Sequence, residues 1–178
     1  MLQALETVWA PRVLSIARAV TALIFMAHGT QKLFGWFGGH GLTGTGGFFE
    51  SLGFRPGVLF ALAAGLGELG GGLLTAAGFL GPVGPALITV VMLVAILTVH
   101  RANGFFASAN GVEMPLMYLT AALPLAFTGA GAYSVDARLG FDALRGPTVA
   151  WIALAAAIVV ALINVALRRP SAPARIAA

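Results

Sequence analysis

Cysteine is absent from this 178-residue chain, and charged side chains are scarce. Without cysteine the chain has no disulfide, no Cys-X-X-Cys redox motif and no cysteine-ligated cluster. Charged residues make up 9% of the chain, against about 25% in a typical soluble domain, so the composition excludes an ordinary soluble enzyme. The ten basic residues form no stripe with interleaved aromatic side chains, and nucleic acid is therefore not an expected partner.

Apolar residues make up 59% of the sequence, and the mean hydropathy is +0.95. A membrane-spanning helix needs about 20 mostly apolar residues, and five such stretches are present. They predict helices over residues 11–37, 58–79, 83–100, 113–129 and 147–167. The sequence thus predicts an all-α integral membrane protein that lies in a lipid bilayer. We expect a four-helix transmembrane bundle over residues 12–140, an additional C-terminal transmembrane helix over 147–167 and a flexible tail over 168–178.

Two connecting segments are expected to lie at the membrane surface. Residues 48–54 are rich in phenylalanine and predict a short interfacial helix or a re-entrant segment at the headgroups. Residues 136–145 are polar and are expected to run along the surface. Within the second predicted helix, Gly67 and Gly71 form a small-xxx-small pair, which allows a neighbouring helix to approach closely.

Ionisable residues lie inside or at the ends of the apolar helices. A charge at the centre of a membrane costs about 2.5–3.5 kcal/mol on insertion scales, so such residues persist when they are paired or serve a site. They are Arg18, His28 and Lys32 in the first helix, Glu68 in the second, His100 at the end of the third and Glu113 at the start of the fourth.

Glu68 is the residue with the greatest need of a partner. It lies about 15 Å from either end of its helix at 1.5 Å per residue, near the middle of the membrane. Arg18 lies inside the first helix at a similar depth, and its long side chain reaches inward. We therefore expect a structural ion pair between Arg18 and Glu68.

The other ionisable residues share one rim of the bundle. His28 and Lys32 lie near the far end of the first helix, where His100 ends the third and Glu113 begins the fourth. A histidine exchanges protons near neutral pH. The candidates for ligand binding or proton exchange are His28, Lys32, Glu68, His100 and Glu113. Phe34, Trp36, Phe105 and Phe106 are expected to wall an apolar slot beside them.

Haem and metal sites are weighed against this pattern. Two histidines on different helices suggest bis-histidine haem ligation, but His28 and His100 both lie at one rim. A metal site that adds Glu68 and Glu113 is chemically possible, yet the four residues lack a characteristic ligand spacing. Neither a haem nor a metal is expected.

Four segments in order resemble motifs of the DoxX family of small bacterial membrane proteins. Residues 28–34, HGTQKLF, resemble its first-helix motif, and residues 67–71, GELGG, its second. Residues 99–113 resemble the end of its third helix and the loop that follows. Residues 129–136, GAGAYSVD, are similar to its closing Gly-x-Gly-x-x-Ser-x-Asp element.

The resemblance implies a four-helix membrane core and a redox-linked role. Members of the family are associated with thiosulfate:quinone oxidoreductase subunits and with membrane-bound oxidoreductase complexes. By this resemblance the chain is a multi-pass subunit in the inner membrane of a bacterium, which binds quinone or docks an oxidoreductase partner through the polar rim. Any enzymatic activity would be that of a quinone-linked oxidoreductase subunit.

Two other classes of function stay open. In a structural or assembly subunit the polar residues would form only an internal network that holds the helices together. A small transporter or proton path is weakly supported, because the sequence has no inverted repeat and Glu68 is its one clear midplane carboxylate. A homo-oligomer is also open.

Overall fold

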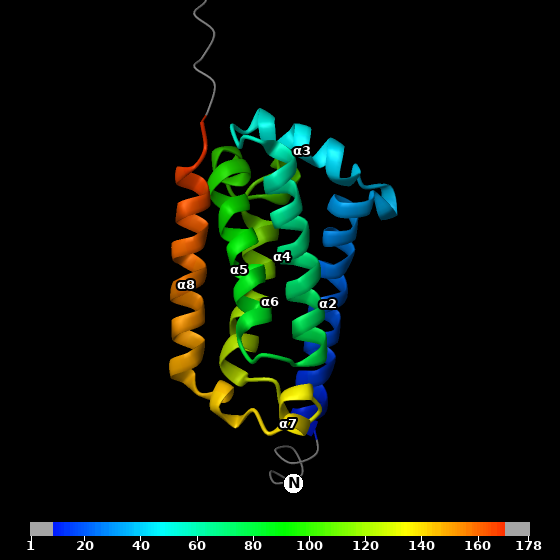
Figure 1. Cartoon of the computed structure of the whole chain (residues 1–178), viewed down its shortest axis with the longest axis vertical. Coiled ribbons are helices and arrows are strands. Elements are labelled where there is room, and N and C mark those ends of the chain that lie inside the picture. Colours follow the sequence, from blue (N-terminus) through cyan, green and yellow to red (C-terminus); the bar gives the residue numbers. More distant parts are fainter. Residues whose placement is uncertain (1–8, 170–178) are drawn as a thin grey trace, which may run out of the picture.

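The computed structural model describes residues 9–169, and all the regular structure there is helical. Five long helices run side by side, with a shorter helix at each end of the bundle (Figure 1). The long helices are α2 (Ala10–Phe34), α4 (Gly57–Ala77), α5 (Val83–Ala95), α6 (Glu113–Thr128) and α8 (Pro147–Ala166), and the short ones are α3 (Gly41–Ser51) and α7 (Val135–Leu139). The predicted all-α membrane fold is confirmed.

Within residues 9–169, four segments are long and apolar enough to cross a membrane: Ala10–Phe34, Gly57–Ala77, Val83–Asn103 and Pro147–Ala166. The third includes α5, a π-helical turn at Ile96–His100 and a 3-10 turn at Arg101–Asn103. Helix α6 has 16 residues and a length of about 24 Å, short of a hydrocarbon core of about 30 Å. It nevertheless returns the chain from the α3 end of the bundle to the α7 end (Figure 1).

The first helix ends earlier than the sequence predicts. The prediction placed its end at residue 37, before a cluster of glycines. Gly35 ends it instead, because this residue adopts the left-handed conformation with a φ of 74° and its N–H donates to the Gln31 carbonyl. The chain then turns sharply towards α3.

The predicted interfacial helix is also longer and begins earlier than expected. Helix α3 covers Gly41–Ser51 and lies across one end of the bundle (Figure 1). Its glycine-rich first half has a low helix propensity, but Gly46 packs directly against Val58 at the start of α4. Tertiary contact therefore outweighs propensity here.

Helices α2 and α4 pack along their length through glycines on both sides. A Cβ atom on Gly29 would lie 2.6 Å from the backbone nitrogen of Leu69 and 2.9 Å from the Gly65 carbonyl oxygen. One on Gly72 would lie 2.9 Å from the Ala22 carbonyl oxygen. The two backbones thus approach as closely as small residues permit in membrane helix pairs.

Helix α8 packs on α5, so the additional helix belongs to the bundle. Its buried residues recur at intervals of three and four along one face. They are Ala150, Leu154, Ala157 and Ala161. Just beyond the helix, Arg168 Nε donates to the Leu52 carbonyl at 2.8 Å and the Arg169 N–H donates to the Gly53 carbonyl at 2.7 Å. The remainder of the predicted tail, residues 170–178, lies outside the described residues.

The end of the bundle opposite α3 is closed by a polar cluster. The Arg18 guanidinium, buried within α2, donates to the carbonyls of Ala130 and Tyr133. Asp136 is fully buried and accepts from the N–H groups of Leu80 and Gly81 at 3.0 and 2.7 Å. These contacts join α2, the α4–α5 turn and the segment after α6.

The expectation that residues 136–145 run along the surface is therefore wrong for Asp136. Its carboxylate is drawn inward because the α4–α5 turn presents two backbone N–H groups that no helix satisfies. Asp142, in contrast, is exposed and forms a surface ion pair with Arg145.

We predict that Gly29→Ala lowers the stability of the protein by about 1–3 kcal/mol, because the new methyl group meets the α4 backbone. Gly70→Ala is the matched control, since a Cβ there meets nothing within 4 Å. Thermal unfolding in detergent measures both. Equal melting temperatures for the two variants would show that the helices are not in close contact.

We predict that Asp136→Ala destabilises the bundle by about 1–3 kcal/mol for each backbone N–H left without an acceptor. Asp142→Ala should leave the stability unchanged within about 0.5 kcal/mol, because Asp142 lies on the surface. Chemical unfolding curves of the two variants provide the comparison. A loss of equal size in both would contradict the buried role of Asp136.

Candidate functional site

An ion pair between Lys32 and Glu68 lies within the membrane-spanning part of the bundle. Lys32 Nζ is 2.7 Å from Oε1 and 2.6 Å from Oε2 of Glu68. The Glu68 side chain is 3% exposed and that of Lys32 is 26% exposed. Glu68 lies eleven residues into α4, about 16 Å from its start. The lysine contacts both carboxylate oxygens, so neither charge is buried alone.

The predicted Arg18–Glu68 pair is wrong. Helices α2 and α4 are antiparallel, and Arg18 lies beside Gly78 at the far end of α4, ten residues from Glu68. That is about 15 Å along the helix. Arg18 instead binds the backbone carbonyls of the closed end, while Lys32 lies within reach of Glu68.

His28 continues the polar cluster towards α6. Its Nδ1 lies 3.1 Å from Gln31 Oε1, and its Nε2 lies 3.4 Å from the Tyr118 hydroxyl. With Nδ1–H donating to the amide oxygen, Nε2 is the nitrogen that accepts from the Tyr118 O–H. The Tyr118 ring also packs edge-on against Phe25, with centroids 5.3 Å apart. Tyr118 was not among the predicted site residues, because a single tyrosine in an apolar helix has no distinctive spacing.

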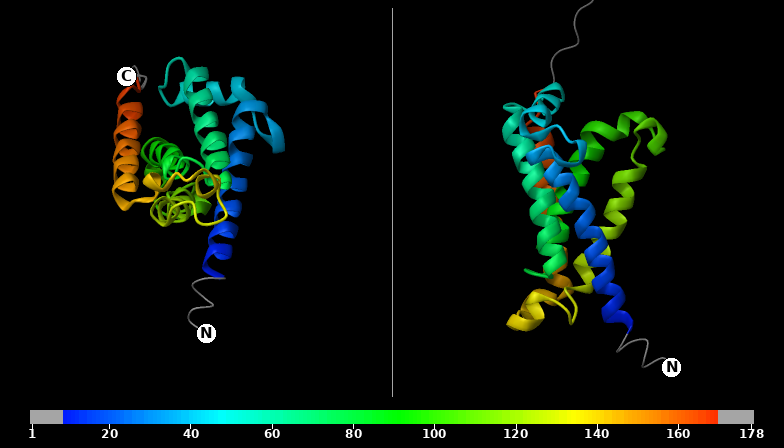
Figure 2. Two further views of the ribbon diagram at one scale, coloured as in Figure 1. Left: turned by 60° about the horizontal axis from the view of Figure 1, so that its bottom comes forward. Right: turned by 90° about the vertical axis from the view of Figure 1, so that its right-hand side faces the viewer.

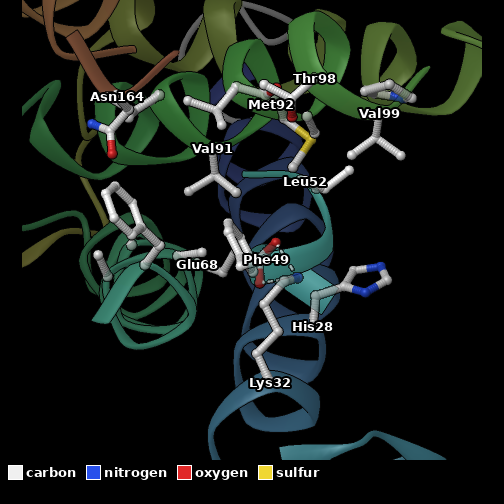
Figure 3. Close-up of a pocket in the computed structure, with 18 of the residues that line it drawn as sticks. His28, Lys32, Phe49, Leu52, Glu68, Val91, Met92, Thr98, Val99 and Asn164 are labelled. Carbon is white, nitrogen blue, oxygen red and sulfur yellow. Dashed lines mark hydrogen bonds and ion pairs between the residues drawn. The ribbon is translucent and has the colours of Figure 1, made fainter. Parts of the chain in front are cut away.

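The ion pair and His28 line one cavity of about 710 Å³. Figure 3 shows the Lys32 ammonium directed at the Glu68 carboxylate, with His28 beside them and aliphatic side chains of α5 across the space. The lining is mostly apolar. It includes Phe48, Phe49, Leu52, Phe54, Phe60, Ala63, Leu87, Val91, Val94, Val160 and Asn164.

The cavity forms because α4 and α5 diverge. Near the turn that joins them, Gly71 packs against Ile88 and the Gly84 carbonyl, and Gly67 still meets Val91. Towards the α3 end, α4 and α5 both line the cavity. Figure 2 shows the segment around residues 100–112 lying away from α2 at this end of the bundle.

His100 also lines the cavity, whereas Glu113 does not. His100 is the last residue of the π-helical turn Ile96–His100. Such a local widening of a helix is frequent at functional sites. Its Nδ1 donates to the Asn110 carbonyl at 2.9 Å. Glu113 begins α6 and accepts from the Ala107 N–H at 2.7 Å. It therefore fixes the loop before α6, and the predicted meeting of all four rim residues is wrong for Glu113.

The predicted aromatic wall is also wrong. Phe34, Trp36, Phe105 and Phe106 are all more than half exposed and do not line the cavity. The aromatic side chains of α3 and of the start of α4 take this place, because α3 folds back over the bundle end.

We predict that substitutions of Lys32 and Glu68 have strongly non-additive effects on the free energy of unfolding. Lys32→Met alone leaves the buried Glu68 carboxylate without a partner and should cost about 3–5 kcal/mol. A double variant, Lys32→Met with Glu68→Met, removes both charges and should recover most of that loss. Unfolding of Lys32→Met, Glu68→Met and the double variant gives the coupling free energy. Strictly additive losses would show that the two side chains do not interact.

Comparisons with known proteins agree with this arrangement. A sequence model of the DoxX family matches residues 13–101, which hold most of α2, all of α3, α4 and α5, and the Lys32–Glu68 pair. An uncharacterized protein of Haemophilus influenzae is 32% identical over 133 residues, which cover 71% of this chain and 90% of that protein. No solved structure matches. The helical membrane fold, the motifs and both matches lead to one conclusion: the chain belongs to the DoxX family of membrane proteins.

Proposed function

We propose that the protein is an inner-membrane subunit of a bacterial redox-linked complex, and that its cavity binds a quinone beside the Lys32–Glu68 pair. The observation that carries the proposal is an apolar cavity of about 710 Å³ inside the membrane with one charged pair in its wall. Cavities that hold small molecules commonly measure about 300–1,000 Å³ and combine an apolar lining with a few convergent polar groups.

The polar residues can supply both the hydrogen bonds and the protons that the reduction of a quinone requires. A bound quinone accepts two electrons and two protons and leaves as the quinol. Lys32 has three N–H donors, so it can donate to a ligand oxygen while it stays paired with Glu68. The Tyr118 hydroxyl and His28 form a hydrogen-bonded pair that places a proton next to the cavity.

The electrons come from a partner oxidoreductase in this proposal. The cysteine-free chain has no thiol with which to relay them, and the family resemblance implies such a partner. His100 lines the same cavity near the segment 101–110, whose residues are all exposed. This residue offers a route for protons between the cavity and the membrane surface.

We predict that His28→Ala weakens quinone binding about tenfold, or about 1.4 kcal/mol, because the Tyr118 hydroxyl beside the cavity loses the partner that orients it. His40→Ala is the matched control, because His40 is exposed and outside the cavity. The assay is equilibrium titration of the full chain in lipid nanodiscs with a benzoquinone analogue, followed by tryptophan fluorescence. The melting temperature of the wild type should rise with the quinone concentration.

Two results would contradict the proposal. One is an absence of saturable quinone binding to the folded wild-type protein. The other is equal affinity in the His28→Ala and His40→Ala variants. If the variants fold less well but a partner complex keeps its full activity per folded subunit, a structural role for the polar cluster is the better account.

A further inference from the structure

The cavity is much longer than a quinone ring requires. Along α5 and the π-helical turn that follows it, the lining runs from Leu87 to His100, thirteen residues or roughly 20 Å at 1.5 Å per residue. The charged pair adjoins only part of this length. The rest is lined mainly by apolar side chains of α3, α4, α5, α6 and α8, with Thr45, Thr98, Asn110 and Asn164 among its polar members.

This apolar part also reaches the lipid-facing surface. Ala63 on α4 and Val160 on α8 line the cavity and are exposed, Val160 to 44%. Each lies six residues from the α3-side end of its helix, about 9 Å below that end. The opening between them therefore faces lipid chains rather than water.

On the α4 and α8 side, the end of the cavity towards the membrane surface is covered, whereas the exposed Asn110 and Met114 line it on the α6 side. Phe48, Phe49 and Leu52 of α3 and the following Phe54 all line it, and Phe54 is fully buried. This cover is held in place from α8. Arg168 donates to the Leu52 carbonyl and lies over the Phe54 ring, with its guanidinium carbon 5.7 Å from the ring centroid.

We propose that the cavity selects a quinone with a long isoprenoid chain, and that the chain lies between α4, α5 and α8 and leaves through the opening beside Ala63 and Val160. The ring then lies at Lys32 and Glu68, and the ligand enters from the membrane. This inference rests on the proposed function, because the ring site is the one described there. It adds the class of ligand and the side from which the ligand comes.

The test compares three ligands on the full chain in nanodiscs. One is a dimethoxy-methyl-benzoquinone without a chain, the second is the same ring with two isoprenoid units, and the third is the two-unit prenyl alcohol without a ring. Affinities are expressed against the ligand concentration in the lipid, so that partitioning alone gives no gain. We expect the chain-bearing quinone to bind at least tenfold more tightly than the bare ring.

Two variants locate the chain. Val160→Trp fills the opening, whereas Val159→Trp adds the same side chain one position away, at an exposed residue that does not line the cavity. Val160→Trp should remove the tenfold gain from the chain and leave the bare ring's affinity unchanged. Val159→Trp should change neither. Ala63→Trp, on the α4 side of the opening, serves the same purpose if Val160→Trp does not fold.

The outcomes separate this inference from the proposed function. If the bare ring binds and the chain adds nothing, or if the chain's gain survives both opening variants, the inference is overturned and the quinone site stands. If only the prenyl alcohol binds, and Val160→Trp abolishes its binding, the chain site stands and the quinone function falls. If none of the three ligands binds, both are overturned.

Discussion

A carboxylate in the middle of a membrane has to be neutralised, and the Lys32–Glu68 pair meets this requirement. Lys32 reaches Glu68 only because α2 and α4 lie in backbone contact, with Gly29 pressed against Leu69 and Gly65. In lipid no apolar driving force joins helices, and close packing and polar contacts take its place. The glycines of the two helices and the charged pair thus depend on each other. The close packing brings Lys32 within reach of Glu68, and the ion pair helps to hold the two helices together.

The two ends of the bundle differ because their polar groups are used differently. At the α7 end, Arg18 and Asp136 bind backbone carbonyl and N–H groups and join three segments of the chain. At the α3 end the polar side chains adjoin a cavity, and the helices stand apart. A closed end provides a rigid base, and the separation of α4 and α5 beyond Gly67, towards the α3 end, creates the space.

The sequence predicts the helices well, but it predicts poorly how far neighbouring helices are offset along their axes. Runs of about 20 apolar residues identify membrane spans whatever their neighbours, so the long helices are found within a few residues. The position of Arg18 along its own helix does not tell how far α2 slides past α4, and this offset decides that Lys32 rather than Arg18 reaches Glu68. Asp136 and Tyr118 were misjudged or missed because local composition does not report burial. Asp136 is buried because the N–H groups of a distant turn bind its carboxylate. Tyr118 belongs to the site because its hydroxyl meets His28 on another helix.

The bonds from Arg168 and Arg169 to Leu52 and Gly53 have a consequence for the biogenesis of the protein. Residues more than a hundred positions apart close the cover over the cavity, and α8 leaves the ribosome after α2 to α7. Until it is inserted, the cavity has no α8 wall and its cover has no anchor. A nascent chain therefore passes through a stage at which the ion pair is already formed by α2 and α4 while the space beside it is still open to the surrounding lipid.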